Sequence, residues 1–350
     1  MLFSLLLFVA VILALLLGYP VALTLGGMSL LVAGVGSLFG MFDTVLLSAI
    51  PSRIYGSVLT NEILMAVPLF IFMGMVLERA RIAEDLLDNL SLLFGQQRGG
   101  LAISVILVGM LLGASTGIVG ATVVTLGLLS LPTLLKRGSD HALATGVVCA
   151  SGSLGQIIPP SIVLVLLGDV LAAAYQQAQT TMGQFNADTV SVGDLFVGAL
   201  IPGLLLVGGY IVYIVVVSLL KPDALGPKPP PRDEQVSMLK LLGVLLPPLL
   251  LMVLVLGSII VGLASPTEAA GVGAFGALLL AWARKGLDRK ILNEAIQRAA
   301  LMSAMVFLIL IGASIFSLVF RGFEGDEWVR DFLHDLPGGK YSALLLVMLV

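Results

Sequence analysis

Apolar stretches separated by short polar segments run along the whole chain. A helix of about 20 apolar residues spans the hydrocarbon core of a bilayer, so each long stretch is a candidate membrane span. The candidates occupy residues 2–17, 19–40, 62–79, 141–168, 194–220, 239–261, 266–283 and 299–320. The pattern therefore predicts an all-α polytopic membrane protein.

Three further segments follow other patterns. Residues 82–95 and 287–298 combine apolar and charged positions at helical spacing, as in amphipathic arms that lie along a membrane surface. Residues 221–236, KPDALGPKPPPRDEQV, are rich in proline and charge. We expect this segment to be a linker that divides the chain into two halves.

Composition and charge support the membrane assignment. Of the 350 residues, 59% are hydrophobic and 11% are charged, whereas soluble domains carry about 25% charged residues. The net charge of −3 is too small to indicate a strongly charged partner, so we expect no nucleic-acid binding.

The cations indicate how the chain is oriented, because Lys and Arg collect in cytoplasmic loops. Fourteen of the 18 fall on one set of segment ends: Arg79, Arg81, Arg98, Lys136, Arg137, Lys221, Lys228, Arg232, Lys240, Arg284, Lys285, Arg289, Lys290 and Arg298. The predicted loop 169–193 contains Asp169 and Asp188 but no cation. We therefore predict that this loop and the N-terminus face the periplasm.

The apolar segment 99–135 has cations beyond both of its ends, so it crosses the membrane either twice or not at all. Two full spans barely fit into 37 residues. Its five central glycines would also make a continuous helix flexible. We favour a re-entrant hairpin, with two tight spans as the alternative.

Two short motifs suggest an internal repeat. GYPVALTLGG (18–27) and GLASPTEAAG (262–271) each follow an apolar span and lead into a helix rich in small residues. LFIFMG (69–74) and LILIGA (308–313) lie in the spans that follow. Five crossings between the two starts would invert the second copy, an architecture found in secondary transporters. The second hairpin would begin near Tyr341 and its broken helix would lie beyond Val350, so we expect a C-terminally truncated chain.

The stretch SGSLGQIIPPSIVLVLLGD (151–169) contains the strongest candidate for a site. Pro159 and Pro160 remove two amide donors from an apolar span, and unpaired backbone survives at membrane depth only inside protein or along a cavity. Carbonyls around Gly155 could then bind a small cation such as Na⁺, while the helix beginning near Ser161 offers amides to an anion. A proline kink with packing value only is the alternative.

The hairpin 109–127 adds hydroxyl groups close to its turn, although small residues there also permit close helix packing. The candidate substrate- and ion-binding residues are Ser115, Thr116, Gly117, Gly120, Thr122, Gly152, Gly155, Pro159, Pro160 and Ser161. Glu268 is either an intramembrane carboxylate or a first-turn cap after Ser265.

No P-loop, nucleophile elbow or dinucleotide fingerprint is present in the sequence. We therefore expect a transport protein that needs no cofactor, rather than an enzyme, with energy supplied by an ion gradient.

GYPVAL, PLFIFMG, the hairpin rich in Gly, Ser and Thr, GQIIPPS and SPTEAA occur in this order along the chain. This series resembles the large membrane (permease) subunit of the bacterial tripartite ATP-independent periplasmic (TRAP) transporters, over essentially the whole chain. It looks closest to the subgroup named for mannitol or chloroaromatic compounds.

The resemblance implies an elevator-type transporter with inverted repeats, re-entrant hairpins and broken helices, in the bacterial inner membrane. It further implies Na⁺-driven symport of an organic acid, a small four-span membrane subunit and a periplasmic substrate-binding protein. The expected Na⁺ ligands are drawn from Ser115, Gly117, Gly155, Ile158 and Pro160.

At the hairpin tip the family usually carries Gly-Ser-Ser, whereas this chain has Gly117, Ile118 and Val119. Ser115, Thr116, Thr122 or backbone carbonyls would have to replace the missing hydroxyl ligands.

The resemblance also suggests a division of the chain. Residues 1–98 would form scaffold spans and an arm, and 99–168 the first transport unit. Residues 169–238 would hold the periplasmic loop, a connecting span and the linker, and 239–350 the second scaffold with the start of the second hairpin. A stand-alone ion-coupled carboxylate carrier and an ion channel are the alternative functions.

Overall fold

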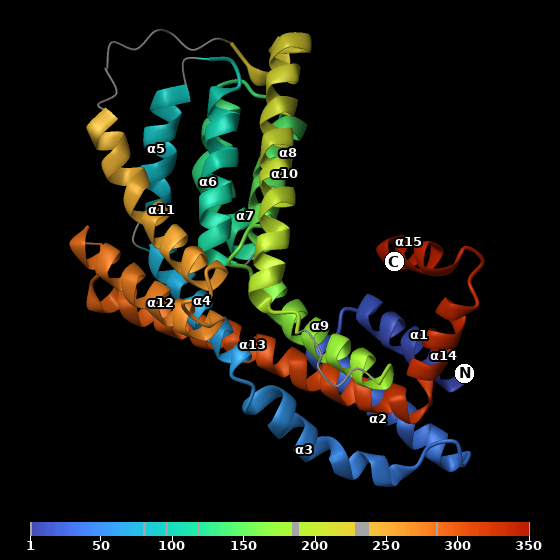
Figure 1. Cartoon of the computed structure of the whole chain (residues 1–350). Coiled ribbons are helices and arrows are strands. Elements are labelled where there is room, and N and C mark those ends of the chain that lie inside the picture. The colour runs from blue at the N-terminus through green and yellow to red at the C-terminus, as the bar shows by residue number, and fades with distance from the viewer. Residues whose placement is uncertain are drawn as a thin grey trace. The chain divides into compact units, whose positions relative to one another are not determined.

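The computed structural model describes residues 2–79, 82–94, 97–117, 119–183, 189–227, 238–284 and 286–349, and within these ranges it contains helices and no strands (Figure 1). The α-helices are α1 (Leu2–Leu16), α2 (Val21–Leu38), α3 (Ile50–Ile54), α4 (Ala66–Arg79), α5 (Ile82–Phe94), α6 (Gly100–Thr116), α7 (Val119–Lys136), α8 (His141–Ser153), α9 (Ile162–Thr181), α10 (Val192–Leu220), α11 (Met238–Ile260), α12 (Pro266–Ala283), α13 (Arg289–Gly322), α14 (Gly325–His334) and α15 (Gly339–Leu349). Short 3₁₀ or π turns occupy Thr44–Ala49 (η1), Tyr55–Leu59 (η2), Ile63–Met65 (η3), Leu154–Gln156 (η4) and Pro222–Leu225 (η5).

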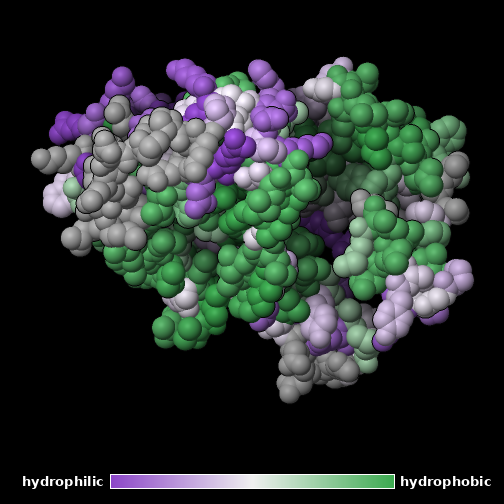
Figure 2. Space-filling view, turned by 90° about the horizontal axis from the view of Figure 1, so that it is seen from above, coloured by the Kyte–Doolittle hydropathy of each residue, from purple (hydrophilic) through white to green (hydrophobic). Residues whose placement is uncertain are grey.

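The all-α polytopic membrane architecture is confirmed. Among the described residues, six helices are long and apolar enough to cross a membrane, and a seventh crossing results if Thr44–Leu59 and Ile63–Arg79 form one broken span. Apolar residues cover much of the surface seen in Figure 2. On α10, for example, Leu204, Leu205, Leu219 and Leu220 are all exposed, which is expected of side chains that face lipid.

The described residues form two compact units, one from residues 1–61 and 302–350 and the other from residues 62–301. In the first unit α1 and α2 pack with the C-terminal part of α13. Its buried core consists of Leu7, Val11, Val32, Ala33, Phe42, Val319 and Phe323. Phe323 is the centre of an aromatic group, with ring centroids 4.9 Å from Phe42 and 5.4 Å from Phe3.

In the second unit α4 lies along α12 (Figure 1). Helix α12 buries a series of small residues: Ala269, Ala270, Gly273, Ala274, Ala277 and Ala281. A methyl group on Gly273 would lie 2.7 Å from the sulfur of Met73, so the glycine leaves room for that side chain. Bulky residues of one helix therefore fill the space that small residues leave on the other.

Helices of the first suspected repeat pack on helices of the second. The motif 69–74 lies in α4, which packs on α12 of the other half. The motif 308–313 lies in α13, where a methyl group on Gly312 would collide with the carbonyl of Ala22 in α2. Helices α2 and α12 are both 18 residues long and both follow a positive-φ glycine, Gly18 or Gly262. These likenesses support an internal repeat.

Arginines join the helices on the side predicted to be cytoplasmic. Arg79 at the end of α4 lies 2.7 Å from Glu294 in the first turns of α13. Arg284 at the end of α12 donates to the carbonyls of Gly243 and Val244 in α11, each at 3.0 Å. These contacts fix helix ends, where a bilayer provides no apolar packing.

Residues 99–135 form a helical hairpin, with α6 and α7 packed side by side beside α8 and α10 (Figure 1). The glycines do not loosen α6, because they serve close packing. A methyl group on Gly113 would lie 2.6 Å from the Cα and N atoms of Gly155, and one on Gly109 would lie 2.9 Å from the carbonyl oxygen of Ser151. Backbone therefore meets backbone where α6 crosses α8.

Three elements differ from the sequence-based predictions. The predicted arm 287–298 is continuous with the next span in the single 34-residue helix α13, because no Pro or Gly lies between residues 289 and 311, where arm and span meet. Helix α9 continues to Thr181, so residues 169–181 are helical rather than part of a loop. Asp188, also predicted there, lies outside the described residues. The turns η1 and η2 occupy a stretch for which no element was predicted, whereas η3 lies at the start of the predicted span 62–79.

The close α6–α8 crossing gives a stability prediction. We expect Gly113→Ala to lower the thermal unfolding midpoint of the purified chain in detergent, because the added methyl group meets backbone that cannot rotate away. Overpacking of this kind costs about 1–3 kcal/mol.

The matched control is Gly120→Ala in α7, where no atom lies within 4 Å of the added group. Since Ala favours helix over Gly by about 1 kcal/mol, this control should unfold at the same or a higher temperature than the wild type. Equal midpoints for the two variants would contradict the close crossing.

Candidate functional site

The span 141–168 is broken at its two prolines, as the sequence predicts. Helix α8 ends at Ser153, η4 follows, and α9 begins at Ile162. The amides of Ile157 and Ile158 both donate to the carbonyl of Leu154, at 3.0 and 2.9 Å. The break is therefore a tight turn within the helical bundle rather than a slight kink.

Ser161 organises the restart of the helix. Its hydroxyl donates to the carbonyl of Gln156 at 2.7 Å and accepts from the amide of Leu164 at 3.4 Å. Ser161 is fully buried. The sequence predicts that the carbonyls around Gly155 are free for a ligand, but the hydroxyl of Ser161 already pairs with that of Gln156. The buried hydroxyl found a partner within the break, as most buried polar groups do.

The hairpin tip rests on this break. Gly117 ends α6 with φ +61°, and its amide donates to the carbonyl of Gly113 at 2.9 Å. The Nε2 atom of Gln156 donates to the carbonyl of Gly117, also at 2.9 Å. A methyl group on Gly117 would lie 3.2 Å from a side-chain carbon of Ile162. The tip of the hairpin and the start of α9 are thus in direct contact.

The side chain of Gln156 is the group that the sequence analysis missed, since only backbone carbonyls of this stretch were considered there. Its Oε1 atom is buried and has no hydrogen-bond partner in the structure. A buried unpaired carboxamide oxygen costs about 1–3 kcal/mol, and a hydrogen-bond donor or a hard cation would remove this cost. A polar side chain in the apolar run before Pro159 was the signal that could have identified it.

The other predicted residues fall into two groups. Gly155, Ile158, Pro159 and Pro160 are buried in the break beside the hairpin. Gly152 lies against α7, where a methyl group on it would be 3.0 Å from the Cα atom of Val123.

The remaining hairpin positions are less clearly part of the break. Thr122 is buried in α7, whereas Gly120 is exposed with open space beside it. Ser115 and Thr116 end α6, and their side chains lie outside what the structure describes, as does the whole of Ile118.

Two acidic side chains have clear local roles. Glu78 of α4 accepts a 2.7 Å hydrogen bond from the Thr125 hydroxyl of α7, a link between the hairpin and α4 that the sequence analysis did not identify. Glu268 and Ser265 form a reciprocal capping box at the start of α12. The cap therefore explains Glu268 without any ligand.

Within the described part of the chain, no group of three or more His, Cys, Asp or Glu side chains could hold a metal ion. The ligands of a cation at the break would therefore be the oxygen atoms of backbone carbonyls, hydroxyls and the Gln156 carboxamide. These oxygens suit a hard ion such as Na⁺ better than a transition metal.

Comparison with known proteins places the chain in a transport family. Residues 8–350 match the family model described as "Tripartite ATP-independent periplasmic transporter, DctM component". The C4-dicarboxylate TRAP transporter large permease protein of Pseudomonas aeruginosa is 31% identical over 288 residues, which are 82% of this chain and 62% of that protein.

Two further relatives have different named substrates. The C4-dicarboxylate TRAP large permease of Rhodobacter capsulatus is 29% identical over 320 residues, covering 90% of this chain and 69% of the relative. The ectoine TRAP large permease of Halomonas elongata is 26% identical over 339 residues, covering 95% of this chain and 72% of the relative. The chain thus spans between three-fifths and three-quarters of the length of these relatives.

The names describe transport components, which agrees with the expectation that the chain is not an enzyme. Since the model match covers nearly the whole chain, and the hairpin and broken helix occur where the family resemblance placed them, the chain belongs to the DctM family of large membrane components of TRAP transporters.

Proposed function

We propose that the chain is the large membrane subunit of a Na⁺-coupled secondary transporter that imports an organic acid delivered by a periplasmic binding protein. The observation that carries the proposal is the contact between hairpin tip and broken helix through Gln156, in a chain of this family. Its buried, unpaired Oε1 atom marks the place where a ligand would satisfy a polar group of the protein.

The coupling ion would bind at the break. The carbonyls of Gly117, Gly155, Ile158 and Pro160 belong to the tip or the break, and Gln156 adds its side-chain oxygen. Na⁺ is a hard cation, for which carbonyl and carboxamide oxygens are suitable ligands. The family's hairpin hydroxyls are replaced here by Ile118 and Val119. Most of the Na⁺ ligands would therefore be the Gln156 oxygen and backbone carbonyls, and the Ser115 hydroxyl would be a further ligand.

The substrate would bind close to the ion. The start of α9 directs its first amides towards the break, and a helix N-terminus carries about half a positive charge. A carboxylate is the group that this end attracts. The hydroxyl of Thr122 would contact the bound substrate, and the open space at Gly120 would leave room for it. The relatives named for C4-dicarboxylates and for ectoine show that the substrate differs among related permeases, so the acid is proposed by class alone.

The proposed assembly includes a small four-span membrane subunit and a periplasmic binding protein, because the family is described as tripartite. One relative carries the name isethionate TRAP transporter permease protein DctMQ. The chain would lie in the inner membrane with its N-terminus in the periplasm, as the cation distribution predicts. Residues 99–168 would move as the transport unit of an elevator, and residues 1–98 and 239–350 would supply the scaffold.

Uptake into proteoliposomes tests the proposal. The chain, reconstituted with both partner subunits, should accumulate a radiolabelled organic acid only when an inward Na⁺ gradient and the binding protein are present. The paired substitution Pro159→Ala and Pro160→Ala should abolish this uptake, because a continuous helix removes the break. Uptake that needs no binding protein would indicate a stand-alone carrier, and current without substrate uptake would indicate a channel.

Gln156→Leu tests the ligand oxygen separately. We expect the Na⁺ concentration for half-maximal uptake to rise roughly tenfold or more, since losing a buried hydrogen-bonding or ligand group costs about 1–3 kcal/mol.

The matched control is Gln179→Leu, since Gln179 also has a buried, unpaired Oε1 atom but lies near the far end of α9. Its Na⁺ dependence should stay within about twofold of the wild type. If both variants respond alike, Gln156 has no special role in ion binding.

A further inference from the structure

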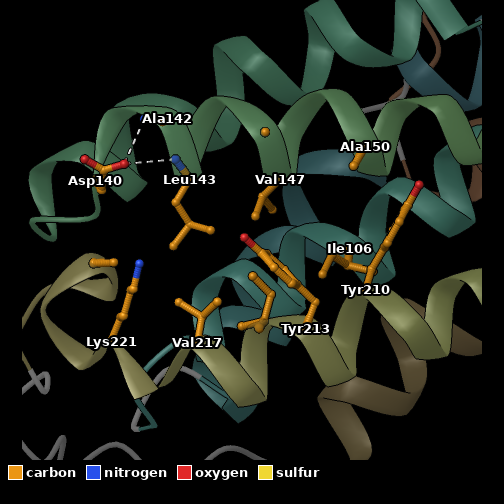
Figure 3. Close-up of a pocket in the computed structure, with 13 residues that line it drawn as sticks. Ile106, Asp140, Ala142, Leu143, Val147, Ala150, Tyr210, Tyr213, Val217 and Lys221 are labelled. Atoms are coloured by element: carbon orange, nitrogen blue, oxygen red, sulfur yellow. Dashed lines mark hydrogen bonds between the residues drawn. The ribbon is translucent and has the colours of Figure 1, made fainter. Parts of the chain in front are cut away.

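A groove of about 780 Å³ lies between α8, which precedes the break, and the C-terminal part of α10 (Figure 3). Leu143 and Val147 of α8 face Tyr213 and Val217 of α10 across it, and Ile106 of α6 also lines it. None of these residues belongs to the contact between the hairpin tip and the broken helix. The groove is therefore a second site, which the proposed transport function does not use.

The lining positions form one face of each helix. Leu143, Val147 and Ala150 are spaced by four and three residues on α8, and Tyr210, Tyr213 and Val217 are spaced by three and four on α10. The lining runs from Asp140 to Ala150 on one side and from Tyr210 to Lys221 on the other, so at 1.5 Å per residue each side is about 15 Å long. The hydrocarbon core of a bilayer is about 30 Å thick. The groove thus has the length of one leaflet, which is the length of one lipid acyl chain.

Two opposite charges mark one end of the groove. Asp140 and Lys221 both lie there in Figure 3, whereas the rest of the lining is apolar apart from the two tyrosine hydroxyls. The Oδ2 atom of Asp140 accepts from the amides of Ala142 and Leu143, at 3.1 and 3.2 Å. The amide of Asp140 donates to the carbonyl of Ala224 at 2.8 Å. These bonds hold the carboxylate at a fixed place beside the lysine.

We infer that this groove binds a phospholipid with an amine in its headgroup, of the phosphatidylethanolamine type. One acyl chain lies along Leu143, Val147 and Val217, the phosphate contacts Lys221, and the ammonium group contacts Asp140. A zwitterionic headgroup matches the pair of charges, and each contact is a charge-assisted hydrogen bond. In the orientation that the cations predict, the lipid belongs to the cytoplasmic leaflet.

The headgroup decides which lipid binds. The bilayer solvates an acyl chain as well as the apolar groove does, so chain burial provides little preference. An anionic lipid such as phosphatidylglycerol would satisfy Lys221 but would place its hydroxyl groups, without a cation, beside Asp140. Selectivity for the amine over the glycerol headgroup is therefore a specific consequence of Asp140.

Native mass spectrometry of the purified chain in detergent tests the inference. Titration with dioleoylphosphatidylethanolamine should give a retained one-lipid adduct, at concentrations at least fivefold lower than dioleoylphosphatidylglycerol requires. Gly146→Trp should weaken the adduct about tenfold, because Gly146 lines the groove and no atom lies within 4 Å of an added Cβ, so the indole can occupy the lipid's place. Lys221→Met should weaken it by a similar factor.

Each variant has a matched control. Gly208→Trp also adds an indole at a glycine without close neighbours, but helical spacing places it on the side of α10 opposite the groove. Lys136→Met removes a lysine at the end of α7, which does not line the groove. Both controls should retain the lipid as the wild type does, and a thermal midpoint within a few degrees of the wild type confirms that each variant is folded.

Unchanged lipid retention in both Gly146→Trp and Lys221→Met would overturn the inference. Equal retention of the two headgroups would overturn it as well. So would a bound polypeptide, in place of a lipid, that Gly146→Trp displaces.

Discussion

The requirement that backbone polar groups be satisfied in an apolar surrounding governs this structure. Two prolines break a helix between α8 and α9, and each carbonyl freed by such a break costs several kcal/mol in hydrocarbon unless a partner is found. Within the break, the Ser161 hydroxyl donates to the carbonyl of Gln156. At the hairpin tip, the Gln156 carboxamide donates to the carbonyl of Gly117. The second bond joins the break to the hairpin tip. The Oε1 atom of Gln156, on the same side chain, is buried without a hydrogen-bond partner.

The contact between hairpin and break depends on close packing elsewhere. The crossing of Gly113 with Gly155 brings α6 against η4, and a side chain at either position would push the tip away from Gln156. The hydrogen bond between Thr125 and Glu78 joins the other helix of the hairpin to α4. Helix α4 packs on α12, and α2 packs on α13, so in each case a helix of the N-terminal half contacts one of the C-terminal half.

Much of this could be predicted from the sequence. Apolar stretches gave the positions of most helices, since length and hydropathy determine which segments can lie in a bilayer. The break at Pro159 and Pro160 was predicted for a local reason, the loss of two amide donors. The hairpin 99–135 was predicted from the cations beyond its ends, although its course through the membrane stays a prediction.

The remaining features depend on contacts between distant residues. Gln156 meets Gly117 across 39 positions of sequence, and Glu78 meets Thr125 across 47. No local pattern in the sequence predicts contacts between residues so far apart. The role of the hairpin glycines was misjudged for the same reason: their low helix propensity is visible in the sequence, whereas the neighbouring backbone that needs the space is not. The continuous helix α13 shows that amphipathic and apolar segments merge when no Pro or Gly separates them.

Ion binding to the purified chain tests the central claim most directly. The thermal unfolding midpoint would be measured in NaCl and in KCl at equal ionic strength, for the wild type and for Gln156→Leu. A ligand that binds only the folded state stabilises it in proportion to the logarithm of its concentration. The account predicts a midpoint that rises with Na⁺ but not with K⁺ in the wild type, and no such difference in the variant. Equal midpoints in the two salts for the wild type, or a Na⁺ effect that survives in Gln156→Leu, would contradict it.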